Sequence, residues 1–154
     1  LICFMDWSYI AGFFDGEGSL TISGKTHRIT IPQTNELVLN SIQNFVGRGS
    51  VFPVKKRKIH WKDSWIYCIT KQEDVLYFLS NIESFLIVKK ELVAQRMPII
   101  KKMVQEYGRK KKLSIKLRED AVKLRQQGLT YRQIGRKLSI DWGYARRVIV
   151  GKKL

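Results

Sequence analysis

The stretch YIAGFFDGEGSL, at residues 9–20, constrains the fold of this chain more than any other segment. It places two carboxylates, Asp15 and Glu17, among three glycines at the end of an apolar run. A buried carboxylate is costly unless it is paired or holds a cation, so the segment should end either at water or at a metal. Asp6 is a favourable N-cap and glycines follow Asp15, which together predict a short helix that ends at the acids.

Polar and apolar residues alternate after the acids, which predicts a hairpin of two strands over residues 19–24 and 27–33. One face of this hairpin should therefore be apolar and the other polar. The residues expected to face the core are Leu20, Ile22, Ile29 and Ile31. The residues expected to face outward are Ser19, Thr21, Ser23, Arg28 and Thr30.

Apolar spacing and capping residues predict more helices and a second hairpin further along the chain. The expected helices are residues 35–47, 72–82 and 88–107, and the expected strands lie within residues 49–59 and 64–70. Pro98 should kink or break the last helix, because proline lacks the N–H group that a helix interior needs. The order of helices and hairpins predicts an α+β fold with one sheet backed by helices.

Positive charge is concentrated in the C-terminal part of the chain. The formal net charge is +16, and residues 108–154 carry +12 of it, with 15 basic and 3 acidic side chains. A field of this sign suits a polyanion, nucleic acid first and an anionic membrane second. The basic run at residues 108–116 predicts a linker between a core of residues 1–107 and a domain of residues 117–154. It serves either as a solvated spacer or as a phosphate contact.

Residues 117–154 predict a small all-α helix-turn-helix domain with helices over residues 118–127, 131–138 and 142–150. Thr130 and Asp141 are the expected caps of the last two helices. A three-helix bundle used only for packing is the alternative, but such a bundle has no need of the excess charge. The residues expected on the exposed face of the recognition helix are Trp142, Tyr144, Arg146 and Arg147.

The two cysteines, Cys3 and Cys68, lie in apolar neighbourhoods without zinc-ligand spacing, so we expect core thiols in a reducing compartment. The apolar start of the chain is too short to span a bilayer. We therefore expect an intracellular, soluble protein of the cytoplasm, nucleoid or an organelle, with no membrane partner.

The first predicted helix has small residues on one side, which would let another backbone approach closely. If that backbone belongs to a second copy, two copies of Glu17 converge at the dyad. Converging carboxylates repel unless divalent cations lie between them, and hard oxygen ligands suit Mg²⁺. Two-metal phosphodiester hydrolysis requires such an arrangement. The alternative is that Asp15 and Glu17 are ordinary turn residues. The expected dimer contacts are Ile10, Ala11, Gly12 and Phe13.

Residues 10–18, IAGFFDGEG, resemble all nine positions of the motif that names the LAGLIDADG homing endonucleases. The predicted elements over residues 6–107 are similar to the αββαββα core of that family, which has a saddle-shaped antiparallel sheet. The segment FLIVKKELV, at residues 85–93, resembles the family segment that supplies a catalytic lysine. The resemblance implies a Mg²⁺-dependent endonuclease, with Mn²⁺ as a substitute metal and no small-molecule cofactor.

The same resemblance implies roles for individual residues. Glu17 and the backbone carbonyl of Gly16 correspond to the metal ligands, and Glu replaces the commoner Asp of the family. Lys89 corresponds to the lysine that steadies the active-site solvent or transition state, although a slip to Lys90 is possible. Gln33 corresponds to a water-positioning glutamine, but strict alternation turns it toward the core unless the preceding proline disturbs the strand.

The resemblance also implies double-stranded DNA and a second copy of the chain as partners. The family lays its sheet along the major groove, so the outward residues of the first hairpin become groove-facing. One copy of the motif makes half a site, which implies a homodimer. The run expected to flank the groove-facing residues, at phosphates or at bases, is Lys55, Lys56, Arg57 and Lys58.

Together these observations predict a site-specific homing endonuclease of an intron- or intein-type mobile element, which hydrolyses double-stranded DNA at a long target site. One alternative is a non-cleaving DNA-binding regulator with the same fold, and the presence of Glu17 and Lys89 favours the enzyme. Another is an intron RNA maturase. A recognition helix cannot enter the deep, narrow major groove of A-form RNA, which argues against the maturase.

Overall fold

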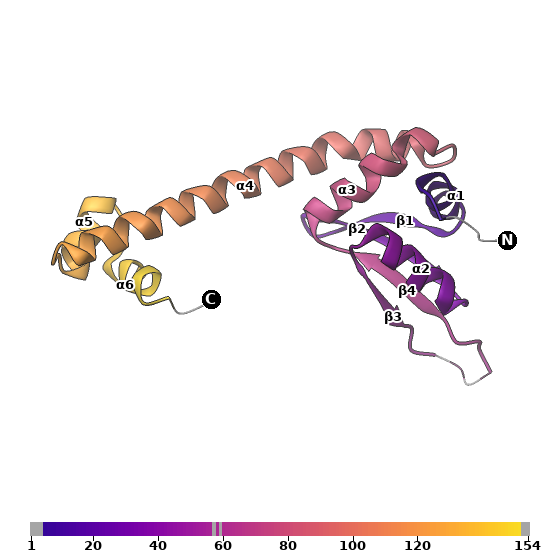
Figure 1. Ribbon diagram of the computed structural model, residues 1–154, viewed down its shortest axis with the longest axis horizontal. Coiled ribbons are helices and arrows are strands. Elements are labelled where there is room, and N and C mark those ends of the chain that lie inside the picture. Colours follow the sequence, from indigo (N-terminus) through magenta and orange to yellow (C-terminus); the bar gives the residue numbers. More distant parts are fainter. Residues whose placement is uncertain (1–4, 57, 59, 152–154) are drawn as a thin grey trace. The chain divides into compact units, whose positions relative to one another are not determined.

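The structure is a computed structural model that describes residues 5–56, 58 and 60–151 (Figure 1). In chain order, the elements are α1 (Trp7–Glu17), β1 (Ser19–Ser23), β2 (Thr26–Gln33), α2 (Glu36–Val46), β3 (Ser50–Pro53), β4 (Trp65–Ile69), α3 (Gln72–Ile82), the short 3₁₀ helix η1 (Glu83–Phe85), α4 (Lys90–Gln126), α5 (Tyr131–Leu138) and α6 (Trp142–Val150). This is the predicted order of helices and hairpins, so the α+β assignment is confirmed.

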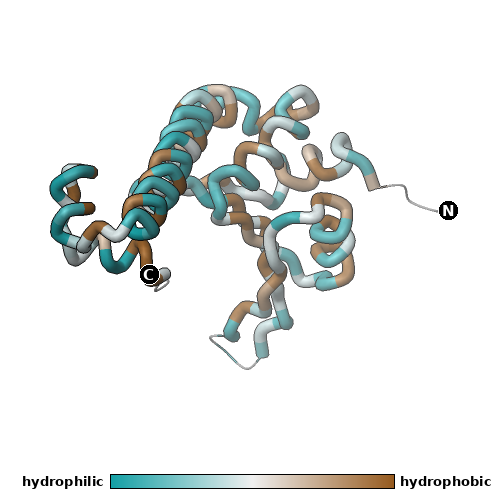
Figure 2. The backbone as a smooth tube through the Cα atoms, turned by 60° about the vertical axis from the view of Figure 1, so that its left-hand side comes forward, coloured by the Kyte–Doolittle hydropathy of each residue, from teal (hydrophilic) through white to brown (hydrophobic). Residues whose placement is uncertain are grey.

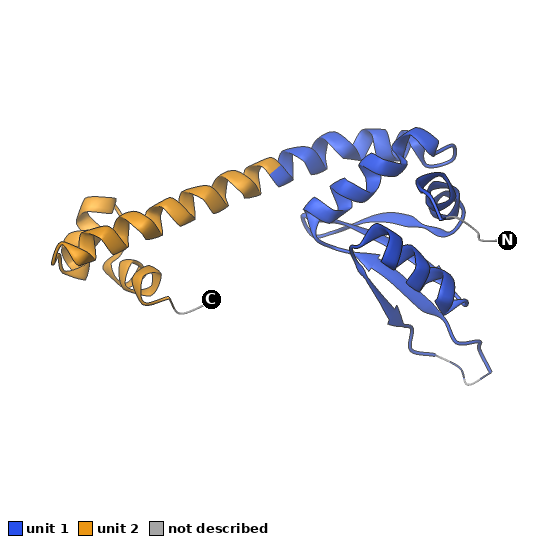
Figure 3. Cartoon of the chain, viewed as in Figure 1, with its two compact units in different colours: residues 1–104 blue, residues 105–154 orange. Residues whose placement is uncertain are grey.

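Internal contacts divide the chain into two compact units, which Figure 3 colours separately. Unit 1 is residues 1–104 and unit 2 is residues 105–154. Each unit has a hydrophobic core of its own. The finer division of the sequence into a core, a linker and a helix-turn-helix domain stays a prediction.

Helix α4 contributes residues to both units and differs from the sequence prediction in two places. It continues through Pro98, because Val93, Met97 and Ile100 are buried in the core of unit 1 and their packing outweighs one lost hydrogen bond. It also continues through residues 108–116, where we expected a linker. Most residues of that run are lysine, arginine or leucine, which have high helix propensity. Hydrophilic residues predominate along α4 (Figure 2).

The sheet of unit 1 is antiparallel, with the strand order β1-β2-β4-β3. Its register pairs Leu20 with Ile29, and Ile29 with Ile69, so these side chains share one face. On that face Ile29, Ile31 and Ile69 are buried against the helices of unit 1. The opposite face is open, as expected for an antiparallel sheet that is covered on one side.

One prediction about the sheet holds only in part and another is wrong. Ile22 lies on the core face but is 51% exposed, because it is next to the last residue of β1, which is an edge strand. Cys68 is half-buried and points to the open face, since its neighbours Tyr67 and Ile69 point to the core. Cys3 lies outside the described residues.

The predicted helix caps are confirmed. The carboxylate of Asp6 accepts a hydrogen bond from the N–H of Tyr9 at 2.8 Å, at the start of α1. Asn35 caps α2, and Thr130 forms a capping box at α5. Asp141 accepts from two backbone N–H groups at the start of α6. Each cap satisfies donors that a helix cannot pair internally, which is why short polar residues mark these positions in sequence.

Unit 2 packs the end of α4 against α5 and α6. Ala121, Leu124, Ile134 and Ala145 form its buried centre. Gly135 allows a close approach, because a Cβ atom there would stand 2.8 Å from the carbonyl oxygen of Ile140. Among the described helices, none combines the length and the apolar character that a membrane crossing requires.

Candidate active site and nucleic-acid interface

Asp15 joins the end of α1 to a segment 72 residues later in the chain. Its carboxylate accepts hydrogen bonds from the backbone N–H groups of Ile87 at 2.6 Å, Val88 at 3.1 Å and Lys89 at 2.9 Å. Partial burial opposes the charged form of Asp15, but these three donors and the nearby Lys89 ammonium hold its pKa below the usual value. The first acid of the motif therefore has a structural partner and is no simple turn residue.

Lys89 is brought to the end of α1 by this contact. Its backbone carbonyl accepts from the N–H of Val93, so Lys89 stands at the start of α4. Its ammonium group donates a hydrogen bond to the backbone carbonyl of Asp15 and lies 5.7 Å from the centre of the Phe14 ring. A cation is favourable at a helix C-terminus, where the last carbonyls lack partners within the helix. The Lys89 ammonium thus contacts α1 at Asp15, two residues before Glu17.

Glu17 is the last residue of α1 and is exposed. Its side chain forms no hydrogen bond or ion pair with another residue in the described part of the chain, and Gly16 beside it is also exposed. Carboxylate and carbonyl oxygens are the ligands that Mg²⁺ prefers, so the donor chemistry at this helix end fits that metal. Within the described ranges, no cluster of three or more His, Cys, Asp or Glu residues could hold a metal ion.

The predicted water-positioning role of Gln33 required Pro32 to disturb the strand, and the structure does not show that disturbance. The pairing of β2 with β4 is regular through Pro32 and Gln33, so the proline does not disturb the strand. Gln33 is half-buried, and its side-chain oxygen accepts from the backbone N–H of Thr34 at 2.8 Å. Its water-positioning role stays a prediction that depends on a change of this local arrangement.

The exposed face of α1 includes only part of the set of residues predicted to contact a second copy. Ile10 and Ala11 are fully buried in the core of their own chain, so they have no surface to offer to a second copy. Gly12 is exposed, and a Cβ atom there would meet nothing within 4 Å. Tyr9 and Phe13 flank it with stacked rings whose centres are 5.9 Å apart. Ile10 and Ala11 lie with Phe14 on the buried side of α1, whereas Gly12 lies on its open side.

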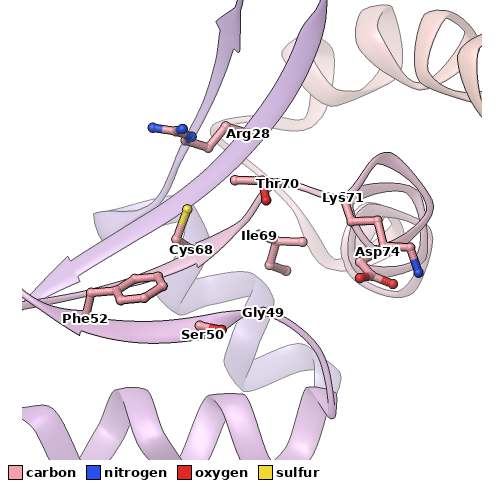
Figure 4. Close-up of a pocket in the computed structure, with 9 residues that line it drawn as sticks. All are labelled: Arg28, Gly49, Ser50, Phe52, Cys68, Ile69, Thr70, Lys71 and Asp74. Carbon is pink, nitrogen blue, oxygen red and sulfur yellow. The ribbon is translucent and has the colours of Figure 1, made fainter. Parts of the chain in front are cut away.

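The open face of the sheet carries the predicted groove-facing residues. Their outward orientation is confirmed by the register, which pairs Ser19 with Thr30 and Thr21 with Arg28. The same register adds residues of the second hairpin, which sequence reasoning missed, because Thr30 pairs with Cys68 and Cys68 with Ser50. Figure 4 shows residues of both hairpins that line a hollow at this face. Its lining includes Arg28, Ser50, Phe52, Cys68, Thr70 and Lys71.

The basic loop between β3 and β4 is described only in part. Lys55, Lys56 and Lys58 are exposed, and Arg57 lies outside the described residues. The Lys56 ammonium is 2.9 Å from the Asp63 carboxylate, an ion pair at the surface that contributes little stability. These lysines remain available to an anionic partner.

Unit 2 presents a basic surface around α5 and α6. Trp142 is 52% exposed and Arg146 and Arg147 are exposed, as predicted, whereas Tyr144 is half-buried, with the Arg147 guanidinium 5.9 Å from its ring centre. The exposed side chains of Trp142, Arg146, Arg147 and Val150 border a hollow along α6. A second hollow at the turn between α5 and α6 is lined by Arg132, Arg136, Ser139 and Trp142, among other residues.

The sequence analysis did not include Arg132 and Arg136 among the basic surface residues. It also predicted no contact between Asp15 and a distant segment of the chain. The helical spacing of Arg132 and Arg136 was a usable signal, because residues four apart share one helix face. No local signal pointed to the contact between Asp15 and residues 87–89, since it joins distant parts of the chain.

Comparison with known protein families gives a match to one family model, described as a LAGLIDADG-like domain, over residues 6–83 of the 154-residue chain. Among curated protein sequences, none matches at a significant level.

Solved structures resemble this one in fold. An archaeal intron-encoded homing endonuclease, I-Vdi141I, complexed with DNA, is 19% identical with a TM-score of 0.53, and the match covers 94% of each chain. The homing endonuclease I-CvuI, in complex with its target in the presence of calcium, is 19% identical with a TM-score of 0.53, covering 94% of this chain and 92% of that one. The meganuclease I-SmaMI, bound to uncleaveable DNA, is 19% identical with a TM-score of 0.51, over 66% of this chain and 38% of that one. At these identities the likeness establishes the fold.

Proposed function

The chain belongs to the LAGLIDADG-like domain family, and from this premise we propose that it is a site-specific endonuclease that hydrolyses double-stranded DNA. The observation that carries the proposal is that the Lys89 ammonium contacts the backbone carbonyl of Asp15, two residues before the exposed Glu17 at the end of α1. A carboxylate beside a lysine at the edge of an open, polar sheet face suits an anionic substrate whose transition state gains negative charge.

The proposed metal is a divalent cation, with Mg²⁺ first and Mn²⁺ as a substitute. Glu17 and the carbonyl of Gly16 would hold it, and when bound it would supply a polarised water and a counter-charge for the phosphate. Glu17 would bind and orient the cation, and Lys89 would hold a positive charge near the scissile phosphate.

A homodimer would bring two copies of Glu17 to one composite site. The proposed contact is the face of α1 around Gly12 and Phe13, where the absence of a side chain on Gly12 leaves room for a second backbone. Two copies of Glu17 would then approach each other, one for each DNA strand. This arrangement would also explain why Tyr9 stays exposed and Phe13 only half-buried in the single chain.

Two DNA contacts are proposed. The open sheet face of unit 1 would lie in the major groove, with Arg28, Thr30 and Ser50 among its base-reading candidates. In unit 2, α6 would act as the recognition helix of a helix-turn-helix, with Arg132 and Arg136 of α5 at phosphates. Intracellular action and an origin in an intron- or intein-type mobile element belong to the same proposal.

A non-cleaving DNA-binding regulator is the second candidate function. The observation that favours it is the basic surface of unit 2 around α5 and α6. A DNA-binding domain with its own core would serve a regulator as well as a nuclease.

The test selects bound sequences from a random double-stranded DNA library and places them in a plasmid with Mg²⁺. We expect the full chain to cut the plasmid at the selected site, and the Glu17→Gln variant to bind that site with similar affinity but not to cut it. The amide keeps the shape of the side chain and removes its negative charge. Binding without cutting by the unaltered protein, in Mg²⁺ and in Mn²⁺, would establish the regulator instead. Equal cutting by Glu17→Gln would remove Glu17 from the site.

A further inference from the structure

We propose that Asp15 is a positioning residue of the nuclease site, which sets Lys89 beside Glu17 by holding the segment that leads into α4. This inference rests on the proposed function of Glu17 and Lys89. It concerns the first acid of the motif, which the sequence left as a possible turn residue.

The hydrogen bonds of Asp15 carry the first step. Both carboxylate oxygens are used, one by the N–H groups of Ile87 and Val88 and the other by the N–H of Lys89. Three consecutive N–H groups thus converge on one side chain. Hydrogen bonds to an ionised acceptor are stronger than those between neutral groups, so this contact fixes the backbone at Lys89 closely.

The second argument is that the side chains of residues 87 and 88 are exposed to solvent. Ile87 is 85% exposed and Val88 is 77% exposed, so their side chains do not anchor this stretch. Leu86, which is 3% exposed, enters the core just before it, and α4 begins just after it. Between these two fixed points the Asp15 carboxylate is the contact that determines where the backbone of Lys89 lies.

The ammonium group of Lys89 carries the third step. It donates to the backbone carbonyl of Asp15, and Phe14, whose ring lies below it, is fully buried. Asp15 therefore contacts Lys89 twice, through its side chain at the backbone and through its own carbonyl at the ammonium. Because Asp15 and Glu17 share the last turn of α1, a displacement of residues 87–89 would move Lys89 relative to Glu17.

The proposed effect is on turnover and not on DNA affinity. A small displacement of a group that acts in the transition state can cost about 100-fold in rate. We expect Asp15→Asn to lower kcat by about this factor and to leave KM for the DNA within about twofold. The asparagine keeps one acceptor oxygen but turns an NH₂ group toward backbone N–H donors.

The experiment uses the full chain, Mg²⁺ and a plasmid with a site selected for binding and cut by the unaltered protein. It compares Asp15→Asn, Lys89→Met and the double variant. If Asp15 acts through Lys89, the double variant should be no slower than Lys89→Met alone, since residues that act as one unit are not additive. Asp15→Glu, which keeps the charge on a longer arm, should be folded and have an intermediate kcat.

Asp6→Ala is the matched control, because Asp6 is a capping carboxylate on the same helix at the end away from Glu17. It should lower the melting temperature without changing kcat. Amide hydrogen exchange should speed up at residues 87–89 in Asp15→Asn and stay unchanged there in Asp6→Ala.

Three results would overturn the inference: an unchanged kcat in a folded Asp15 variant, losses from Asp15→Asn and Lys89→Met that multiply, or a loss confined to KM. A full chain that binds the selected DNA and does not cut it would instead overturn the proposed function, and this inference with it.

Discussion

Two acids only two residues apart have different environments in this protein. Asp15 is half-buried and accepts three backbone N–H groups, whereas Glu17 is exposed and makes no such bond with a described residue. The helix explains the difference, because residues two apart point to different sides of the helix axis. One acid thus faces the body of unit 1 and the other faces outward, where a metal or DNA can reach it. Asp15 thus holds two segments of the fold together, whereas Glu17 is free for the metal-binding role that we propose for it.

His27 has an environment that predicts a pH dependence of stability. Its side chain is 3% exposed, and neither ring nitrogen has a hydrogen-bond partner among the described residues. Burial lowers the pKa of His27 below 6.5; Gln72 opposes part of this shift, and the charge of Arg96 adds a smaller lowering. As the pH falls below about 6.5, the unfolded chain binds a proton before the folded chain does. Stability should therefore be full above that pH and decrease below it.

The measurement is the free energy of unfolding in urea between pH 7.5 and pH 5.5. We expect the unaltered protein to lose up to about 1.4 kcal/mol per pH unit in the lower part of this window. His27→Leu should flatten that dependence, since leucine has no proton to bind. His60→Leu, at an exposed position, serves as the control and should leave the curve unchanged. A His27→Leu curve that is parallel to that of the unaltered protein would contradict the assignment.

At the scale of elements, α1 performs two tasks on opposite faces. Its inner face buries Ile10, Ala11 and Phe14 in the core of unit 1, and its outer face leaves Gly12 and Gly16 open. Glycine in a helix interior costs roughly 0.5–1 kcal/mol relative to alanine, so two exposed glycines make α1 less stable by itself. A backbone-to-backbone contact with a second copy would account for them.

Gly12→Leu tests this role of α1. Because a Cβ atom at Gly12 meets nothing within 4 Å in its own chain, the substitution should leave the fold of the single chain intact. It should nevertheless keep two copies apart, so light scattering should show a monomer where the unaltered protein is a dimer. Gly108→Leu is the matched control, since that helical position is equally open. A monomeric unaltered protein that cuts both DNA strands would contradict the proposed dimer.

At the scale of the whole molecule, the two units differ in size of core and in net charge. Unit 1 holds the sheet and the larger core, and unit 2 is a small helical unit in the most basic part of the chain. A small core with many surface cations is the composition of a nucleic-acid-binding module. Two separate surfaces for one DNA would raise affinity through their joint engagement.

A truncation after Tyr107 tests the contribution of the basic part. It removes 12 of the 16 net positive charges, so DNA binding should weaken and its dependence on salt should become shallower, because fewer counterions are released. The footprint on the selected DNA should also shorten. Circular dichroism should show that the truncated chain keeps a cooperative melting transition, as the separate core of unit 1 predicts. An unchanged footprint and salt slope would make unit 2 a stabilising or protein-binding appendage.

The sequence by itself determined the order of the elements, their caps and the two faces of the first hairpin. These features depend on signals that act over a few residues: the capping bonds of Asp6 and Asn35, the alternation along β2, and the helical period of α2. The motif at residues 10–18 also located the family, and the match over residues 6–83 agrees with it.

Only the tertiary structure decided which residues from distant segments meet. The contact of Asp15 with residues 87–89, the exposure of Ile22 and the continuation of α4 through Pro98 depend on packing between segments that local patterns do not describe. Helical period alone could not separate buried Ile10 from open Gly12, because the side of α1 that faces the sheet depends on how the helix docks. Local free energies set what each segment forms, whereas the burial of side chains from distant segments sets where each segment lies.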